Sequence, residues 1–189
     1  RREWGLRRSK IFSQDSGIYY SKVNPYYNNK YGIVLEKNIP LQLTNRSLQA
    51  GVCTVKHGNG RDWWIITRNW FQSNRFNIFL ISPDSIFGPF EQNIGSITLT
   101  DAAIMSVNKQ GNKLVLANNA GLIETYSFDR CSGQISNPLR IISNPAVQFA
   151  GCEFSPDGNL LYISNTNNIF GGDSLRIYQF DLTNSNPSA

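Results

Sequence analysis

The residues best equipped for acid–base chemistry lie in one short stretch, 56–64. It contains His57 and Asp62, and a histidine beside a carboxylate can act as a general base with its orienting group. His57 is the only histidine of the chain, and no serine lies in a Gly-x-Ser-x-Gly turn. A nucleophilic triad therefore lacks its partners. We predict instead that His57 and Asp62 are a structural pair that satisfies the backbone of one tight turn.

Aromatic side chains follow directly and could form a binding platform. Trp63 and Trp64 alternate along a predicted strand, so they point to opposite faces, and we expect both to be buried between sheets. The next aromatic pair falls in the loop after that strand, where exposure is expected, with an arginine on each side. The candidate ligand-binding residues of this loop are Trp70, Phe71, Arg68 and Arg75.

A second candidate binding loop spans residues 26–31 and is rich in tyrosine and asparagine. Tyr26, Tyr27 and Tyr31 offer stacking surfaces and hydroxyl groups at a low cost in side-chain entropy. The loop could bind a protein or a glycan. The alternative is an ordinary long hairpin loop.

Metal and cofactor chemistry has little basis in this sequence. The cysteines, Cys53, Cys131 and Cys152, form no Cys-x-x-Cys pair, so we predict buried or half-buried free thiols, with a Cys53–Cys152 disulfide as the alternative. No Asp-x-Asp-x-Asp-Gly loop is present. We predict no metal and no cofactor. Calcium held near three turn aspartates is the alternative: Asp101, Asp157 and Asp173.

The net charge of +5 is concentrated at one end of the chain. The first ten residues carry +4 of it, through Arg1, Arg2, Arg7, Arg8 and Lys10 opposed by Glu3. No basic stripe crosses the remainder, so we predict no specific nucleic-acid partner. We expect these ten residues to be a solvated or truncated end, with a polyanion-binding arm as the alternative, and residues 1–15 receive no place in a blade. No apolar run is long enough to predict a transmembrane segment.

An internal repeat organises the rest of the chain. Residues 56–67, 107–117 and 154–164 align on Gly60, Gly111 and Gly158, which are spaced 51 and 47 positions apart. Each copy predicts a turn with glycine at positive φ, followed by a buried strand.

A third strand follows in each repeat, at 76–84, 123–129 and 175–181, where aromatic residues alternate with period two. A fourth is expected in the linking stretches, for example 97–100 and 139–142. Before the first repeat, 17–23 and 32–37 predict another hairpin.

A period near 50 with four strands fits the blade of a β-propeller. The predicted fold is all-β: about three four-stranded blades with part of a preceding blade, from a parent of seven blades. The predicted segments are the partial blade 16–50, the blades 51–98, 99–143 and 144–181, and 182–189 as the start of a next blade or a linker. Because three blades cannot close a ring, we expect other blades or chains to complete it.

The stretch 56–64 resembles a motif of large secreted propeller proteins of Bacteroidetes, many of which end in type IX secretion or gliding-motility-associated domains. Residues 19–21, 36–38, 128–137, 152–158 and 178–182 follow in the order expected there. The Ser-Pro-Asp-Gly turn at 155–158 is typical of many propellers, including lactonase-like and WD40-like ones. The resemblance covers residues 16–183 and implies a location outside the cell or on the outer-membrane surface.

Two tripeptides agree with that location. Asp84-Ser85-Ile86 and Asp173-Ser174-Leu175 resemble the sites at which Bacteroidetes O-glycosylate serine or threonine, so Ser85 and Ser174 are candidate modification sites.

The leading functional hypothesis is a non-enzymatic extracellular propeller module that binds proteins or glycans through its loops, or that spaces domains. The alternative is a lactonase- or lyase-type enzyme whose central-channel site is completed by blades absent from this chain. Fold alone does not decide between them.

Overall fold

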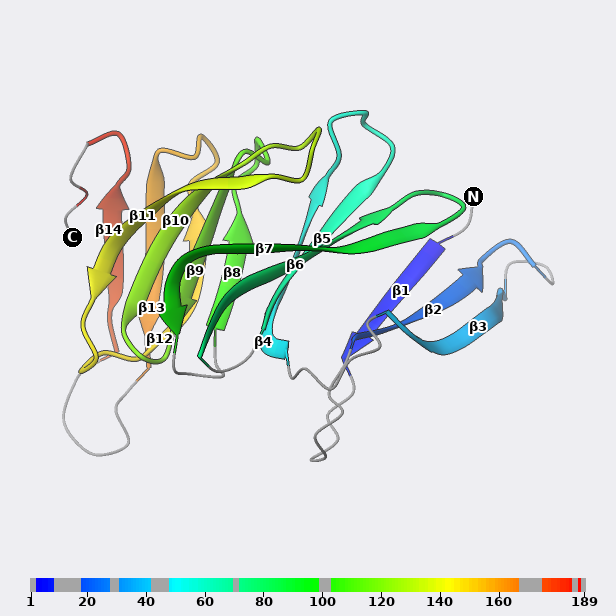
Figure 1. The fold of residues 1–189 in the computed structure, drawn as a ribbon, viewed down its shortest axis with the longest axis horizontal. Coiled ribbons are helices and arrows are strands. Elements are labelled where there is room, and N and C mark those ends of the chain that lie inside the picture. Colours follow the sequence, from blue (N-terminus) through cyan, green and yellow to red (C-terminus); the bar gives the residue numbers. More distant parts are fainter. Residues whose placement is uncertain are drawn as a thin grey trace. The chain divides into compact units, whose positions relative to one another are not determined.

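The computed structural model describes residues 3–8, 18–27, 31–41, 48–69, 72–98, 103–166, 175–184 and 187. These residues form fourteen strands in four sheets and include no helix (Figure 1). The predicted all-β fold with four-stranded sheets is confirmed. The chain divides into two compact units, residues 1–48 and 49–189.

The first unit is one antiparallel sheet in the order β1-β2-β3, formed by β1 (Glu3–Arg8), β2 (Ile18–Asn24) and β3 (Ile33–Pro40). The predicted hairpin is present as β2 and β3. The sequence predicted no strand in residues 3–8, which form β1. They pair with β2 along their whole length, from Glu3 opposite Val23 to Arg8 opposite Ile18.

The second unit contains three sheets, which we call the first, second and third sheets. The first sheet has the order β4-β5-β6-β7 and the second β8-β9-β10-β11, while the third has three strands among the described residues, β12-β13-β14. The strands of the first sheet are β4 (Leu48–Lys56), β5 (Trp63–Asn69), β6 (Ser73–Ile81) and β7 (Ile86–Thr98). Those of the second are β8 (Ala103–Val107), β9 (Lys113–Asn118), β10 (Leu122–Phe128) and β11 (Ile135–Ser143), and those of the third are β12 (Phe149–Phe154), β13 (Leu160–Asn165) and β14 (Ile177–Asp181).

In each sheet of the second unit, the turn between the first and second strands is built as the repeat predicts. Gly60, Gly111 and Gly158 have φ values of 72°, 75° and 76°. Their N–H groups donate to the carbonyls three residues earlier, at distances of 3.0, 2.8 and 2.9 Å. A side chain at these positions would strain the backbone, so glycine fixes the three equivalent turns.

The fourth strands begin earlier than expected, at Ile86 and Ile135 rather than near 97 and 139. Both contain a residue at positive φ followed by proline, Gly88-Pro89 and Asn137-Pro138, and the pairing register shifts beside them. These bulges interrupt the period-two pattern, and most side chains of both strands are exposed or half-buried. The alternation that reveals a strand in sequence is therefore missing.

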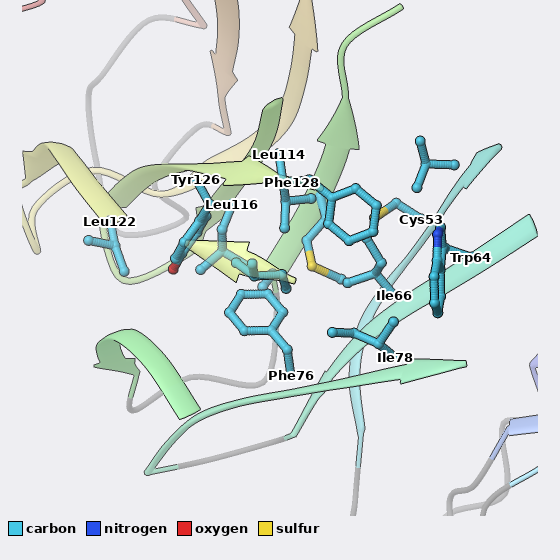
Figure 2. Close-up of a cluster of buried hydrophobic side chains, with 14 residues drawn as sticks. Cys53, Trp64, Ile66, Phe76, Ile78, Leu114, Leu116, Leu122, Tyr126 and Phe128 are labelled. Carbon is cyan, nitrogen blue, oxygen red and sulfur yellow. The ribbon is translucent and has the colours of Figure 1, made fainter. Parts of the chain in front are cut away.

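The hydrophobic core lies between consecutive sheets. Where the first and second sheets meet, which we call the first junction, Trp64, Ile66, Phe76 and Ile78 pack with Leu114, Leu116, Tyr126 and Phe128 (Figure 2). At the second junction, Val115, Ala117 and Ile123 of the second sheet pack with Phe149, Phe154, Leu161, Ile163 and Phe180 of the third.

One expectation about the core was wrong. Trp64 is buried, with 4% of its surface exposed, but its neighbour Trp63 is 45% exposed. Alternation placed the two indoles on opposite faces correctly, but it could not show how far each face is covered.

Candidate functional site

The His57 turn holds the first sheet against the second. The backbone N–H of Asn59 donates to His57 Nδ1 at 3.0 Å, so the ring proton is on Nε2, which lies 3.0 Å from the carbonyl oxygen of Cys131. Both ring nitrogens are therefore engaged with backbone. In this geometry His57 bridges two turns rather than facing a reactive group.

Asp62 points to a different set of partners. Its carboxylate accepts from Arg61 Nε and from Asn59 Nδ2, each at 2.8 Å. These hydrogen bonds, first from Arg61 and then from Asn59, hold the pKa of Asp62 below its usual value. His57 and Asp62 thus flank one turn, as predicted, but each bonds to other groups and they do not form an acid–base dyad.

Arg130, in the turn after β10, provides much of the contact with this region. Its Nε donates to the Lys56 carbonyl at 2.8 Å, and its Nη1 donates to the Gln110 carbonyl at 3.1 Å. The Arg130 carbonyl in return accepts from Trp64 Nε1 at 2.8 Å and from the Gly58 N–H at 2.9 Å. Sequence reasoning did not single out Arg130, because nothing local distinguishes it from a solvated turn residue.

The close approach of these turns depends on Gly58. A Cβ added there would lie 2.5 Å from the Cys131 Sγ, closer than atoms can pack. A side chain at position 58 would therefore force the Cys131 thiol to move, although Gly58 is not a positive-φ position.

Arg68, a candidate ligand-binding residue beside the predicted loop, is not at the surface. It is part of β5 and is fully buried, with 0% of its surface exposed. Its guanidinium lies 5.0 Å from the centre of the Phe76 ring, and Nη2 donates to the carbonyls of Ser73 and Ser96 at 3.1 and 2.5 Å. As the strand runs on to Asn69, Arg68 points into the first junction and cannot contact a ligand at the surface.

The buried guanidinium is one member of a polar network across the first junction. Arg68 Nη1 lies 3.4 Å from the Tyr126 hydroxyl, which donates to Glu124 in a short hydrogen bond. The Glu124 carboxylate also accepts from the Ser96 N–H and hydroxyl, each at 3.0 Å. Burial is the largest cause of the raised pKa of Tyr126. Because Arg68, Glu124 and Tyr126 are all buried, the network bridges the two sheets and offers no open site.

Of the other candidate residues of this loop, only Arg75 is among the described residues. Arg75 lies in β6 and pairs with Glu91 of β7 at 3.0 Å, whereas Trp70 and Phe71 lie outside the described residues. The tyrosines of the second candidate loop are exposed: Tyr26, Tyr27 and Tyr31 show 64%, 56% and 88% of their surfaces to solvent.

The candidate modification and metal residues have separate surroundings. Ser85 is exposed in the tight turn between β6 and β7, and Ser174 lies outside the described residues. The Asp157 carboxylate accepts from Ser155 Oγ at 2.5 Å and from Asn159 N–H at 3.1 Å, while Asp101 and Asp173 are outside the described residues. In the described part of the chain, no three His, Cys, Asp or Glu side chains gather as a metal site would require.

All three cysteines are free thiols. Cys53 is buried and Cys152 half-buried, and burial raises the pKa of each to about 12. The expectation was wrong for Cys131, which is exposed in the turn that contacts His57. Over the described ranges, the structure contains no helix that is long and apolar enough to cross a membrane.

The comparison with known proteins shows a likeness in fold. No family model matches the chain, and no curated protein matches it. Among solved structures, the chain is similar to the β-propeller domain of Myceliophteria thermophila Cps50 (Swd1), with a TM-score of 0.52 and 14% sequence identity. The match covers 92% of this chain and 55% of that one, so the chain spans about half the length of its structural neighbour. At this identity the likeness shows the fold, and the fold is that of a β-propeller.

Proposed function

We propose that this chain is part of a β-propeller scaffold that binds a partner protein through exposed loops, in a secreted or cell-surface bacterial protein. The fold supports the scaffold role, because a propeller presents turns and loops from a rigid set of stacked sheets. The sequence resemblance to secreted propeller proteins of Bacteroidetes supports the location.

One observation carries the choice of binding surface. Tyr26, Tyr27 and Tyr31 are all exposed on a single hairpin, between β2 and β3. Tyrosine supplies a large, rigid contact area with a hydroxyl at its edge, and it is enriched at protein interfaces. Scattered exposed aromatic residues are common, but these three lie within six residues of the same hairpin.

Five acid–base side chains of the described turns form hydrogen bonds within the fold. His57 bonds to two backbone groups, and Asp62, Asp129, Asp157 and Asp181 bond to their own turns. These side chains therefore hold the turns in shape. The tyrosine hairpin is the better candidate for recognition.

The test compares the chain with a variant carrying Tyr26→Ser, Tyr27→Ser and Tyr31→Ser. Both are immobilised and exposed to outer-membrane and secreted protein fractions of a Bacteroidetes species, and retained proteins are identified by mass spectrometry. A retained protein is then purified and its affinity for both chains is measured. We expect the triple substitution to weaken binding at least tenfold, because aromatic residues dominate such interfaces.

Tyr162→Ser is the matched control, since Tyr162 is a partly exposed tyrosine of the third sheet. Equal binding by the triple variant and the control would refute the tyrosine hairpin as the interface. A glycan array probed with the same three chains tests the alternative that the hairpin binds a carbohydrate. Tyrosine-dependent binding to a glycan and to no protein would replace the protein partner with a carbohydrate.

A further inference from the structure

The chain contains one Asn-Gly pair, Asn59-Gly60, and it lies in the turn between β4 and β5. Asparagine is chemically labile before glycine, because glycine has no side chain that hinders attack of its backbone nitrogen on the asparagine side chain. Both residues are exposed. Apart from the adjoining residues, no heavy atom of the described chain lies within 4 Å of the position that a Gly60 Cβ would take. Packing therefore does not block a reaction at this pair.

The reaction of such a pair is deamidation through a cyclic imide. The Gly60 nitrogen gives up its proton and bonds to Asn59 Cγ, while the bond between Cγ and Nδ2 breaks and the side-chain nitrogen leaves with that proton as ammonia. One water molecule then opens the imide at either of its carbonyls. The product at position 59 is aspartate, or isoaspartate in which the main chain runs through the side-chain carbon.

Hydrogen bonds of the folded turn occupy both reacting groups. Asn59 Oδ1 accepts from the Arg61 N–H at 2.9 Å and the Asp62 N–H at 3.0 Å, and Asn59 Nδ2 donates to the Asp62 carboxylate at 2.8 Å. The Gly60 N–H donates to the His57 carbonyl at 3.0 Å. Ring closure needs the Gly60 nitrogen without its proton and the Asn59 amide free to turn toward it. These hydrogen bonds must therefore break before the imide can form.

The same turn contacts the second sheet. The Gly58 N–H donates to the Arg130 carbonyl at 2.9 Å, and His57 Nε2 lies 3.0 Å from the Cys131 carbonyl oxygen. The Asn59 N–H in turn donates to His57 Nδ1 at 3.0 Å and so orients the ring. Isoaspartate adds a methylene carbon to the main chain at position 59, which changes the path of the chain between these donors and β5.

Deamidation also changes the charge of the turn. In the aspartate product, an oxygen replaces the nitrogen that donates to Asp62, so two carboxylates face each other at hydrogen-bond distance. The equivalent turn of the third sheet carries a carboxylate at this position, Asp157, but donors surround it there, the Ser155 hydroxyl and the Asn159 amide. A carboxylate at position 59 would instead oppose a second negative charge.

We propose that Asn59-Gly60 is a deamidation site that the folded turn holds in check, and that its product weakens the contact between the first and second sheets. The inference does not depend on the tyrosine hairpin, so the proposed function and this site are tested separately.

Mass spectrometry of proteolytic peptides measures the conversion at position 59, because an acid is heavier than the amide that it replaces. The whole chain is incubated at neutral pH in its native form, in urea, and as the variant Asp62→Ala. We expect conversion to be about tenfold faster in Asp62→Ala than in the native chain, and faster still in urea, because the Asn59 amide loses a hydrogen bond to a charged group. Asp157→Ala, in the equivalent turn of the third sheet, is the matched control and should keep the native rate.

Two results would overturn the restraint by the fold. Equal conversion in the native and the urea-unfolded chain would show that the folded turn does not hold the reaction back, and this comparison needs no variant. An absence of conversion in urea would show that the pair is not labile.

Hydrogen exchange of the Gly58 amide tests the effect of the product, because this N–H donates to the Arg130 carbonyl of the second sheet. We expect it to exchange about tenfold faster in Asn59→Asp than in the native chain. Adding Asp62→Asn should restore slow exchange, since it places an amide donor opposite the new carboxylate. The Gly158 amide should keep its rate in all three chains. Unchanged Gly58 exchange in Asn59→Asp, or no recovery in the double variant, would refute the effect of charge on this contact.

Discussion

The same repeat forms both junctions, but the side chains and hydrogen bonds that hold the sheets together differ between them. At the first junction, Trp64 of the first sheet contacts Phe128 of the second edge to face, and Phe76 contacts Tyr126 in the same way. At the second junction, the side chains that the second sheet packs against the third include Val115 and Ala117, which are much smaller. The larger side chains bury more apolar surface, so the first junction should contribute more to stability.

The polar contacts differ in the same direction. The first junction contains buried members of a charged network, and the amide of Gln92 bonds to the backbone of Gly133 and Ile135 at 2.9 Å each. At the second, Gln110 and Lys113 reach backbone carbonyls of the third sheet at 3.2 to 3.4 Å near solvent. Water competes with such exposed contacts, so they hold the second junction less tightly. The same repeat can therefore form sheet contacts that differ in their contribution to stability.

The largest expected effect is that of Trp64→Ala. It opens a cavity at the centre of the first junction and removes the hydrogen bond to the Arg130 carbonyl, so we expect a loss of about 3–5 kcal/mol in the free energy of unfolding. Urea denaturation measures it. Trp63→Ala is the control, and an equal loss there would show that burial in the first junction is not the source of the effect.

The buried network should show strong coupling. Arg68→Met leaves the Ser73 and Ser96 carbonyls without their charged donor, and we expect it to cost about 3 kcal/mol. Glu124→Gln should cost somewhat less, since an amide keeps part of the hydrogen bonding. In a double-mutant cycle, the double variant should be more stable than the sum of the single losses indicates. Strict additivity would mean that the two residues act independently.

Two glutamines compare the junctions directly. Gln92→Ala removes bonds to Gly133 and Ile135 from a partly buried position, so we expect a loss of about 1–2 kcal/mol. Gln110→Ala removes longer, exposed contacts, and we expect a loss below about 0.5 kcal/mol. A larger loss for Gln110→Ala would reverse the ranking of the junctions.

Acid should weaken the turns that Asp129 and Asp157 stabilise, one in the second sheet and one in the third. Hydrogen bonds from Ser132 and from Ser155 are the first causes of the lowered pKa values of Asp129 and Asp157. A carboxyl whose folded-state pKa is depressed stabilises the protein above its unfolded pKa of about 3.9, and that stability is lost as the pH falls through the lower folded value. We therefore expect thermal stability to decline below about pH 4. Asp129→Asn should flatten part of this decline, and an unchanged profile would contradict the assignment.

The smallest effect is a difference in thiol labelling. In a Cys131→Ser background, Cys53 at the first junction and Cys152 at the second have similarly raised pKa values of about 12, so thiolate content does not separate them. We expect Cys152 to react with iodoacetamide at a lower urea concentration, because the second junction opens first. Simultaneous labelling would indicate that both junctions open together.

The sequence predicted the fold where local rules act and missed what depends on neighbouring sheets. Gly60, Gly111 and Gly158 mark the turns because positive φ is a local demand. Arg68 was a candidate ligand-binding residue beside a loop. Its burial depends on contacts with Phe76 and Tyr126 in the first junction, which no local pattern shows. The candidate loops could be named from composition, but the exposure of Tyr26 and the pairing of Arg75 with Glu91 depend on tertiary contacts.

The bulged outer strands also bear on polymerisation. A regular edge strand can template another copy, and repeated addition yields a fibril. Pro89 and Pro138 have no N–H to offer an incoming strand, and the kinks at Gly88 and Asn137 bend the edge away from a flat template. The prolines and bulges of β7 and β11 therefore reduce the regular hydrogen-bonding edge that these two sheets offer to another strand.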